Sequence, residues 1–450
     1  MKTSTTSVNT GMASEHLVAW IGLDWADNQH QISIHDIASG QVESYALKHS
    51  PETLQRWLDD LRKRYCGGKV AVVLEQSRGA VLYALMNCDF VVLYPVNPLA
   101  LASYRKAFYT SGAKDDPRDA TLLMEMVSKH PERFRAWEAE DPDTRSLRLV
   151  VEARRKLVNQ LTRCTNQLTS HLKSYFPQAI EWAGDLDSRQ ACDFLEQWPT
   201  LEALQQARPS RLRKFYFNYG RPRVEIIEAR LGQIKQALPL TQDPAAILAG
   251  SLMVRALAAQ IRPLLATIEE FDDEIKRLFQ KHPDRQLFES FPGAGTVLAP
   301  RLLAAVGVDR ERWTSAAEIQ AFSGIAPVTK QSGKTRFVHR RLACSKFVRQ
   351  TFHEFAGSSI VWCDWAKAYY DHLIAHGKGR HVALRALAYK WIRILFACWK
   401  NRTPYQEEIF LQALAQRGSS LSQLAQAAQR TKTAKKSCIN LCKTLCVKCG

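Results

Sequence analysis

The chain has 450 residues, is 46% hydrophobic and carries a formal net charge of +18, from 62 Lys plus Arg against 44 Asp plus Glu. This length allows two or more domains, and the charge indicates a polyanionic partner, for which nucleic acid is a better candidate than a membrane surface. Because neither a secretion signal nor an uninterrupted apolar stretch of about 20 residues is visible, we expect a cytoplasmic protein with reduced cysteines and no membrane partner.

The first part of the chain has the pattern of an α/β domain. Residues 1–15, rich in Ser and Thr, are predicted to form a flexible lead. Strands are predicted at residues 17–24, 31–35, 70–75 and 90–94, with a helix at residues 51–64. Strands that alternate with helices indicate a parallel or mixed sheet covered on both faces, which we place over residues 16–135.

Acidic side chains mark the ends of two of these strands. Asp24 ends the first strand and Glu75 ends the third. In α/β sheets the functional groups gather at the carboxyl ends of strands, so both carboxylates are candidates for a site. The helix that follows Pro98 is expected to carry Tyr104 and Arg105 toward a third acidic segment.

That segment, Lys-Asp-Asp-Pro-Arg-Asp-Ala at residues 114–120, holds three carboxylates at a predicted helix start. Asp116 and Asp119 lie three residues apart and Asp115 and Asp119 lie four apart, so either pair would share a helix face. The spacing does not choose between Asp115 and Asp116. Carboxylate oxygens are the ligands that Mg²⁺ prefers, and Mg²⁺ ions commonly serve phosphoryl transfer on nucleic acids.

The same segment also has a purely structural explanation. Asp116 as the N-cap, Pro117 at the first helical position and Asp119 in the first turn make a stable helix start without any metal. The two acids at strand ends, Asp24 and Glu75, favour the metal hypothesis over this alternative.

Helices predominate beyond residue 131, and we interpret residues 143–285 as a helical coiled-coil region. Its clearest evidence is an apolar repeat in steps of four and three residues at Leu257, Ile261, Leu264, Ile268, Phe271, Ile275 and Leu278. Pro263 should kink that helix. An earlier repeat, from Val150 to Tyr175, is interrupted by Arg154, Cys164 and His171. Residues 178–250 form an irregular helical insert, and residues 245–259, the most apolar stretch of the chain, are expected to be a buried helix.

A mainly α-helical domain is predicted at residues 286–405. It opens with a Gly-rich turn at residues 291–296, whose backbone amides could hold phosphate, and it contains a polar, glycine-interrupted loop at residues 322–334. The tail at residues 419–450 is polar and then basic, which favours nonspecific phosphate contacts. It contains Cys438, Cys442, Cys446 and Cys449. Only the last two have a zinc-site spacing, so Zn²⁺ binding there is not expected.

Several motifs together resemble the transposases of the IS110 insertion-sequence family and their Piv invertase relatives. They are Gly-Leu-Asp-Trp-Ala at 22–26, Leu-Glu at 74–75, the acidic segment at 114–120, Phe-Pro-Gly at 291–293 and Ser-Gly-Lys at 332–334. The resemblance covers residues 15–130 and 285–400. It implies an N-terminal RuvC-like (RNase H-like) domain with an Asp-Glu-Asp-Asp (DEDD) tetrad and a C-terminal transposase domain with a nucleophilic serine. Some family members are guided by a structured RNA made from the element's own ends.

Carried onto this chain, the resemblance places the tetrad at Asp24, Glu75, Asp116 and Asp119, and it selects Asp116 over Asp115. Mg²⁺, or Mn²⁺ in its place, is the implied cofactor. The serine falls on Ser332, although the family's usual Ser-Ser-Gly-Gly is reduced here to one serine before Gly333. Basic residues around Ser332 would hold the scissile phosphate: Lys330, Lys334, Arg336, His339, Arg340 and Arg341.

The leading hypothesis is therefore an insertion-sequence recombinase that cuts and rejoins DNA through a phosphoserine intermediate at Ser332, assisted by the DEDD cluster. A structured guide RNA and a homo-oligomer, dimer or tetramer, are the expected partners besides donor and target DNA. One alternative is a RuvC-like, metal-dependent endonuclease without serine chemistry. Another is a non-catalytic RNA- or DNA-binding protein.

Overall fold

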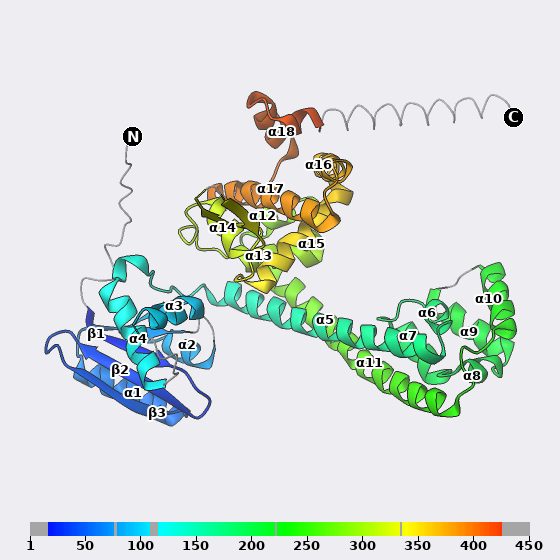
Figure 1. The fold of residues 1–450 in the computed structure, drawn as a ribbon, viewed down its shortest axis with the longest axis horizontal. Helices are drawn as coiled ribbons and strands as arrows, with labels where there is room; N and C mark the ends of the chain where they lie inside the picture. Colours follow the sequence, from blue (N-terminus) through cyan, green and yellow to red (C-terminus); the bar gives the residue numbers. More distant parts are fainter. Residues whose placement is uncertain (1–16, 76–78, 109–115, 221–222, 334, 425–450) are drawn as a thin grey trace. The chain divides into compact units, whose positions relative to one another are not determined.

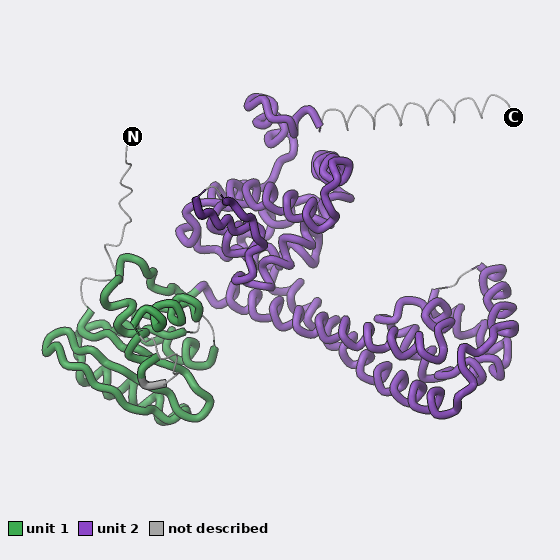
Figure 2. The backbone as a smooth tube through the Cα atoms, in the orientation of Figure 1, with its two compact units in different colours: residues 1–139 green, residues 140–450 purple. Residues whose placement is uncertain are grey.

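The computed structural model describes residues 17–75, 79–108, 116–220, 223–333 and 335–424. The chain divides into two compact units, residues 1–139 and residues 140–450, which Figure 2 shows in green and purple. The predicted flexible lead at residues 1–15 and the four cysteines of the tail lie outside the described residues. The N-terminal unit is a mixed α/β fold, and the remainder is mostly helical.

The N-terminal unit is built on a five-stranded sheet (Figure 1). Its strands are β1 (Leu17–Asp24), β2 (Gln29–Asp36), β3 (Val42–Lys48), β4 (Lys69–Leu74) and β5 (Val91–Pro95), in the order β3-β2-β1-β4-β5. β1 pairs antiparallel with β2 and parallel with β4, so the predicted mixed sheet is confirmed. β3 was not predicted from the sequence: it is an edge strand whose side chains are exposed except Leu47, so it lacks an apolar run.

Helices cover both faces of this sheet, as the sequence predicts. α1 (Pro51–Arg64) begins at Ser50, whose side chain accepts a hydrogen bond from the backbone of Thr53, and it buries Trp57, Leu58 and Leu61. It shares an apolar core with α2 (Ala80–Leu85) on one face. α3 (Pro98–Phe108) and α4 (Asp116–Lys129) form a second core on the other face. A 3₁₀ turn, η1 (Pro131–Arg133), follows α4.

Gly22 in β1 allows α4 to lie directly on the sheet. A Cβ atom built on Gly22 would lie 1.8 Å from the backbone oxygen of Ala120 and 2.9 Å from the backbone nitrogen of Met124, both in α4. Ser33 in β2, which is paired with Gly22, accepts a hydrogen bond from the hydroxyl of Thr121 at 3.2 Å. Only glycine at position 22 leaves room for the helix backbone, so this residue sets the position of α4.

Two long helices, α5 (Pro142–Tyr175) and α11 (Pro244–Lys281), lie side by side in the second unit (Figure 1). The predicted apolar face of α11 is confirmed, with Leu257, Ile261, Ile268 and Ile275 buried, and the helix continues through Pro263. This pairing is within one chain, and a coiled coil between protomers stays a prediction.

Two of the residues that interrupt the apolar repeat of α5, Arg154 and Cys164, take part in its packing. Arg154 makes a two-point ion pair with Asp272 of α11, with Nε–Oδ1 and Nη2–Oδ2 distances of 2.5 and 2.7 Å. Cys164 is buried against the same helix. Thus a polar residue in the repeat pairs with a complementary polar residue across the interface.

The prediction of a buried helix at residues 245–259 is only partly right. Gly250, Val254 and Leu257 are buried, whereas Leu248 and Leu252 are 62% and 57% exposed. Among the described residues, α11 alone has the length and apolar composition that a membrane-spanning helix needs. It packs against α5 along one face, as amphipathic helices in globular proteins do.

The irregular insert between these helices has an apolar core of its own. It consists of α6 (Ala179–Trp182), α7 (Arg189–Gln197), α8 (Leu201–Gln205), α9 (Pro209–Gly220) and α10 (Val224–Gln236). Aromatic side chains from these helices and from the end of α5 fill the core, among them Phe176, Trp198 and Phe215. The many aromatic residues of the insert therefore have a packing role.

The remaining helices of the second unit surround another apolar core, separate from that of the insert. They are α12 (Arg285–Glu289), α13 (Gly295–Val306), α14 (Ala316–Phe322), α15 (Lys346–Trp362), α16 (Asp364–Ala375), α17 (Arg380–Asn401) and α18 (Glu407–Gln416). Trp365, Trp391 and Trp399 are fully buried in this core. The predicted polar loop at residues 322–334 is wrong in part, because β6 (Val328–Ser332) and β7 (Thr335–His339) form a β-hairpin there.

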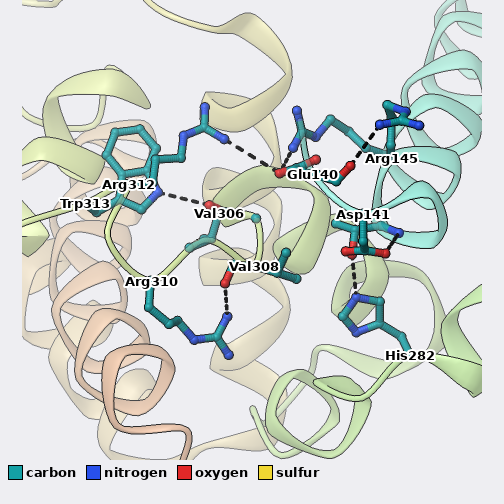
Figure 3. Close-up of polar contacts among 12 residues, drawn as sticks. Glu140, Asp141, Arg145, His282, Val306, Val308, Arg310, Arg312 and Trp313 are labelled. Atoms are coloured by element: carbon teal, nitrogen blue, oxygen red, sulfur yellow. Dashed lines mark hydrogen bonds and ion pairs between the residues drawn. The ribbon is translucent and has the colours of Figure 1, made fainter. Parts of the chain in front are cut away.

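Polar contacts join the start of α5 to the loop after α13 (Figure 3). The carboxylate of Glu140 pairs with Arg148 and with Arg312. The neighbouring Trp313 donates its indole N–H to the carbonyl of Val306 at 3.0 Å. A Cβ on Gly307, which has a φ of 81°, would lie 2.7 Å from Glu140, so glycine is required beside this carboxylate. These contacts fix the long helix to the C-terminal core within one unit.

Candidate active site

Asp24 and Glu75 lie at the same end of the sheet in neighbouring strands. β1 and β4 are parallel, and their register pairs Leu23 with Leu74, so the two predicted acids come next: Asp24 is the last residue of β1 and Glu75 directly follows β4. Side chains alternate along a strand. Asp24 therefore shares a face with Gly22, which contacts α4, and Glu75 shares a face with Val73, which belongs to the α4-side core.

Asp119 reaches the same face from the first turn of α4. The residue is only 3% exposed, and it directly precedes Ala120, whose backbone contacts Gly22. Both of its carboxylate oxygens are bound by Arg105 of α3, with an Nε–Oδ1 distance of 2.7 Å and an Nη2–Oδ2 distance of 2.5 Å. This ion pair confirms the expectation that the helix after Pro98 carries Arg105 toward the acidic segment.

The fourth predicted acid cannot be placed with the other three. α4 is described from Asp116, one residue before the predicted first helical position at Pro117, and the side chain of Asp116 and the whole of Asp115 lie outside the described residues. Among the side chains that the structure does describe, no three His, Cys, Asp or Glu are grouped closely enough to hold a metal ion. The donor chemistry suits Mg²⁺, but the described arrangement, with Asp119 held by Arg105, does not form a site for it.

A histidine pair beneath the loop after Asp24 was missed from the sequence. His30 is 1% exposed, and its Nδ1 accepts the backbone N–H of Ala26 at 3.3 Å. Its Nε2 must then carry the proton that it donates to Nδ1 of His49, 2.9 Å away. Burial, and secondly the nearby His49, lower the pKa of His30. Alternation in β2, which places His30 on the same face as Ile32 and Ile34, would have revealed its burial.

Ser332 belongs to the second unit and is exposed at the end of β6. Thr335 lies directly opposite Ser332 in the hairpin, and the turn between them includes Gly333 with a φ of 56°. Lys330 and Ser332, two residues apart, share one face of the hairpin. The hairpin thus displays a serine hydroxyl next to a positive charge.

The other predicted phosphate ligands follow along the same segment. Arg336, His339 and Arg340 are exposed, Arg341 is partly exposed, and Lys334 lies outside the described residues. The sequence analysis missed Phe337, which is paired with Lys330, is 58% exposed and stacks on His339 with 6.1 Å between ring centroids. Aromatic faces beside basic side chains are typical of single-stranded nucleic-acid surfaces.

Two family models match the chain in the regions that hold these residues. A model of DEDD transposases of the IS110 type, described as "Transposase", matches residues 21–177. A second model, described as "Transposase IS116/IS110/IS902 family", matches residues 285–371. The first region contains all four predicted acids, and the second contains Ser332.

Whole-length relatives come from insertion elements. The mini-circle transposase candidate for IS117 from Streptomyces coelicolor is 26% identical over 404 residues, which cover 88% of this chain and 97% of the relative. The 43.6 kDa protein of insertion element IS110 from the same species is also 26% identical, over 88% of this chain and 97% of its own length. The 42 kDa protein of insertion element IS900 from Mycobacterium paratuberculosis is 24% identical, over 86% and 96% respectively.

Proposed function

The chain belongs to the IS110 family of transposases and is an enzyme that cleaves and rejoins DNA; we propose that it does so through a phosphoserine intermediate at Ser332. The observation that carries the proposal is the position of Ser332. This residue lies exposed in a basic hairpin inside the region that matches the second transposase model. An exposed hydroxyl is open to a DNA phosphate, whereas a serine with only a turn-forming role would not need the surrounding cations.

The acids of the N-terminal unit form the second part of the proposal. Asp24, Glu75, Asp116 and Asp119 would together bind Mg²⁺, or Mn²⁺ in its place, within a RuvC-like fold. Support comes from the match to a DEDD transposase model and from the three described acids, which lie at one end and on one face of the sheet. When bound, the cation would supply charge neutralisation at the phosphate.

The basic hairpin would bind the scissile phosphate and the strand around it. Lys330 shares a face with Ser332, Arg336 lies on the other face, and Arg340 follows directly after β7. A net charge of +18 supports additional phosphate contacts elsewhere on the chain. The proposed partners are donor DNA, target DNA and a structured guide RNA. The proposal also includes a homo-oligomeric state and a cytoplasmic location.

The proposal is tested with Ser332→Ala and a matched control, Thr335→Ala. Thr335 lies opposite Ser332 in the same hairpin, so its replacement removes a neighbouring hydroxyl from a similar position. The substrate is a plasmid that carries the genomic element encoding this chain with both of its ends. Ser332→Ala should abolish strand exchange and the covalent protein–DNA adduct seen on a denaturing gel, and Thr335→Ala should retain both.

The alternative, a RuvC-like endonuclease without serine chemistry, gives the opposite result. In that case Ser332→Ala would cut DNA as well as the wild type does, and no adduct would form with either protein. Sequencing the nucleic acid that copurifies with the chain tests the guide. A discrete RNA derived from the ends of the element supports guided recognition, and a preparation without one contradicts it.

A further inference from the structure

The helical insert has a surface hollow whose charged side chains are all positive. The hollow has a volume of about 560 Å³ and lies where the chain passes from α8 into α9. Its lining residues are Gln206, Ala207, Arg208, Ser210, Arg211 and Lys214. Arginine and lysine side chains without a carboxylate among them attract an anion.

The cations of this hollow differ from a neighbouring arginine on the same helix. Arg213 of α9 makes a two-point ion pair with Glu228 of α10, with Nε–Oε1 and Nη2–Oε2 distances of 2.6 and 2.9 Å. Among the described residues, the three cations of the hollow have no carboxylate partner. Glu202 accepts a hydrogen bond from Gln206 at 3.0 Å but is not part of the lining. The positive charge of the hollow is therefore not cancelled within the insert.

Arg211 is held in position by two neutral groups. Its Nη2 donates a hydrogen bond to Oε1 of Gln197 at 3.0 Å, and its guanidinium carbon lies 5.6 Å from the centre of the Trp198 ring. Trp198 belongs to the apolar core of the insert. Lys214 follows one helical turn later, and residues at this spacing are neighbours on a helix surface. Arg211 is thus oriented without losing its charge, which lowers the entropic cost of binding an anion.

The composition of the lining favours the phosphates of a double helix over other anions. Small-molecule pockets are mostly apolar, whereas here the three cations and Ser210 are exposed polar side chains. Surfaces for single strands stack bases on aromatic rings, and the lining contains no aromatic residue. Arg, Lys and Ser side chains commonly bind the backbone phosphates of a duplex, and such contacts do not read its sequence.

The hollow is separated from the hairpin of Ser332 by the length of α5. Val151, near the start of α5, packs in the core of the C-terminal helices, and Leu172, near its end, packs in the core of the insert. At a rise of about 1.5 Å per residue, the two cores lie about 30 Å apart along this helix. That distance corresponds to about nine base pairs of duplex DNA. The hollow would therefore contact a different stretch of backbone from the hairpin.

We propose that this hollow binds the phosphate backbone of a double-helical nucleic acid, with Arg208, Arg211 and Lys214 as the phosphate ligands. The inference goes beyond the proposed function, because it assigns a nucleic-acid contact to the insert. It depends on neither the serine chemistry nor a metal. Duplex DNA and base-paired RNA offer the same phosphate groups, and the experiment distinguishes between them.

The experiment measures binding of the full-length protein to labelled duplexes of about 30 base pairs, by fluorescence anisotropy over a series of salt concentrations. Arg211→Gln should weaken binding to duplex DNA roughly five- to ten-fold at about 0.1 M salt and reduce the slope of log affinity against log salt by about 0.9, because one phosphate contact is lost. The loss should be the same for two unrelated sequences. Lys214→Gln should behave alike, and it leaves the packing of Arg211 on Trp198 intact.

Arg213→Gln is the matched control, because it removes one positive charge from the same helix outside the hollow. It should change the affinity less than about two-fold, since exposed charges are screened beyond about 10 Å at this salt concentration. Equal losses in Arg211→Gln and Arg213→Gln would show that overall charge, and not the hollow, determines binding. Wild-type affinity in both Arg211→Gln and Lys214→Gln would also overturn the inference.

The same measurements with duplex RNA identify the natural ligand of the hollow. A loss of affinity for DNA alone assigns the hollow to donor or target DNA, and a loss for RNA alone assigns it to a base-paired RNA. Ser332→Ala should bind both duplexes as the wild type does. Failure of the serine chemistry and failure of this inference are therefore seen in different experiments.

Discussion

Replacing Gly22 with alanine should displace α4 and with it Asp119. The new Cβ would lie 1.8 Å from the backbone oxygen of Ala120 and 2.9 Å from the backbone nitrogen of Met124. Non-bonded heavy atoms pack favourably near 3.5 Å, so α4 would have to withdraw by roughly 1.5 Å. Both neighbouring atoms belong to the helix backbone and cannot rotate away as a side chain could.

The cost of this substitution should be at the upper end of the range for overpacked cores, about 3 kcal/mol. Leu123 and Val127, which are fully buried between α4 and the sheet, would lose contacts when the helix withdraws. For a unit of this size such a loss corresponds to a melting temperature lower by about 10 °C.

Hydrogen exchange measured by mass spectrometry locates the effect, and a thermal melt gives its size. Peptides from β1 and α4 should exchange faster in Gly22→Ala, whereas peptides from the second unit should not change. Gly232→Ala is the matched control, because Gly232 lies inside α10 with open space around its Cβ position. The control should be neutral or stabilising by up to about 1 kcal/mol. A Gly22→Ala protein with wild-type stability and exchange would refute the argument that glycine sets the position of α4.

Three further predictions concern the histidine pair, the long helices and the hairpin. Because burial lowers the pKa of His30, the folded state should lose stability as the pH falls below the ordinary histidine value of 6.5, and His30→Gln should flatten this loss in melts between about pH 7.5 and about pH 5.5. A double-mutant cycle of Arg154→Met and Asp272→Asn, followed by urea unfolding, should give a coupling of about 1 kcal/mol, and additivity would contradict the pairing across α5 and α11. Phe337→Ala should weaken binding of a single-stranded oligonucleotide by about 1 kcal/mol or more in fluorescence anisotropy, whereas unchanged affinity would exclude stacking on this ring.

Much of the N-terminal fold was predictable because its central strands, β1 and β4, are buried on both sides. β1 and β4 read as continuous apolar runs, and the acids that follow them mark the strand ends. β3 and the β6–β7 hairpin were not predicted because most of their side chains face water. Their sequences show neither an apolar run nor an alternation of apolar and polar residues, so they resemble loops.

The residue types of the candidate site could be predicted from the sequence, but the partner that each side chain contacts could not. Spacing along the chain brought Asp119 and the strand-end acids to one region, and the resemblance to transposases chose Asp116 over Asp115. The ion pair between Arg105 and Asp119 joins two helices, and periodicity in one helix carries no information about which partner the other helix presents. Gly22 likewise has a role that depends on a residue 98 positions later, Ala120.

Removal of divalent metal should leave the N-terminal unit folded, because protein contacts alone already hold Asp119. Gly22 fits α4 onto the sheet, Thr121 bonds to Ser33, and Arg105 neutralises the buried carboxylate. A structural metal site behaves differently, since chelation there removes folding free energy outright. The melting temperature in EDTA should therefore equal that in metal-free buffer. Unfolding of β1 and α4 in EDTA, detected by hydrogen exchange, would show that the metal rather than the packing positions Asp119.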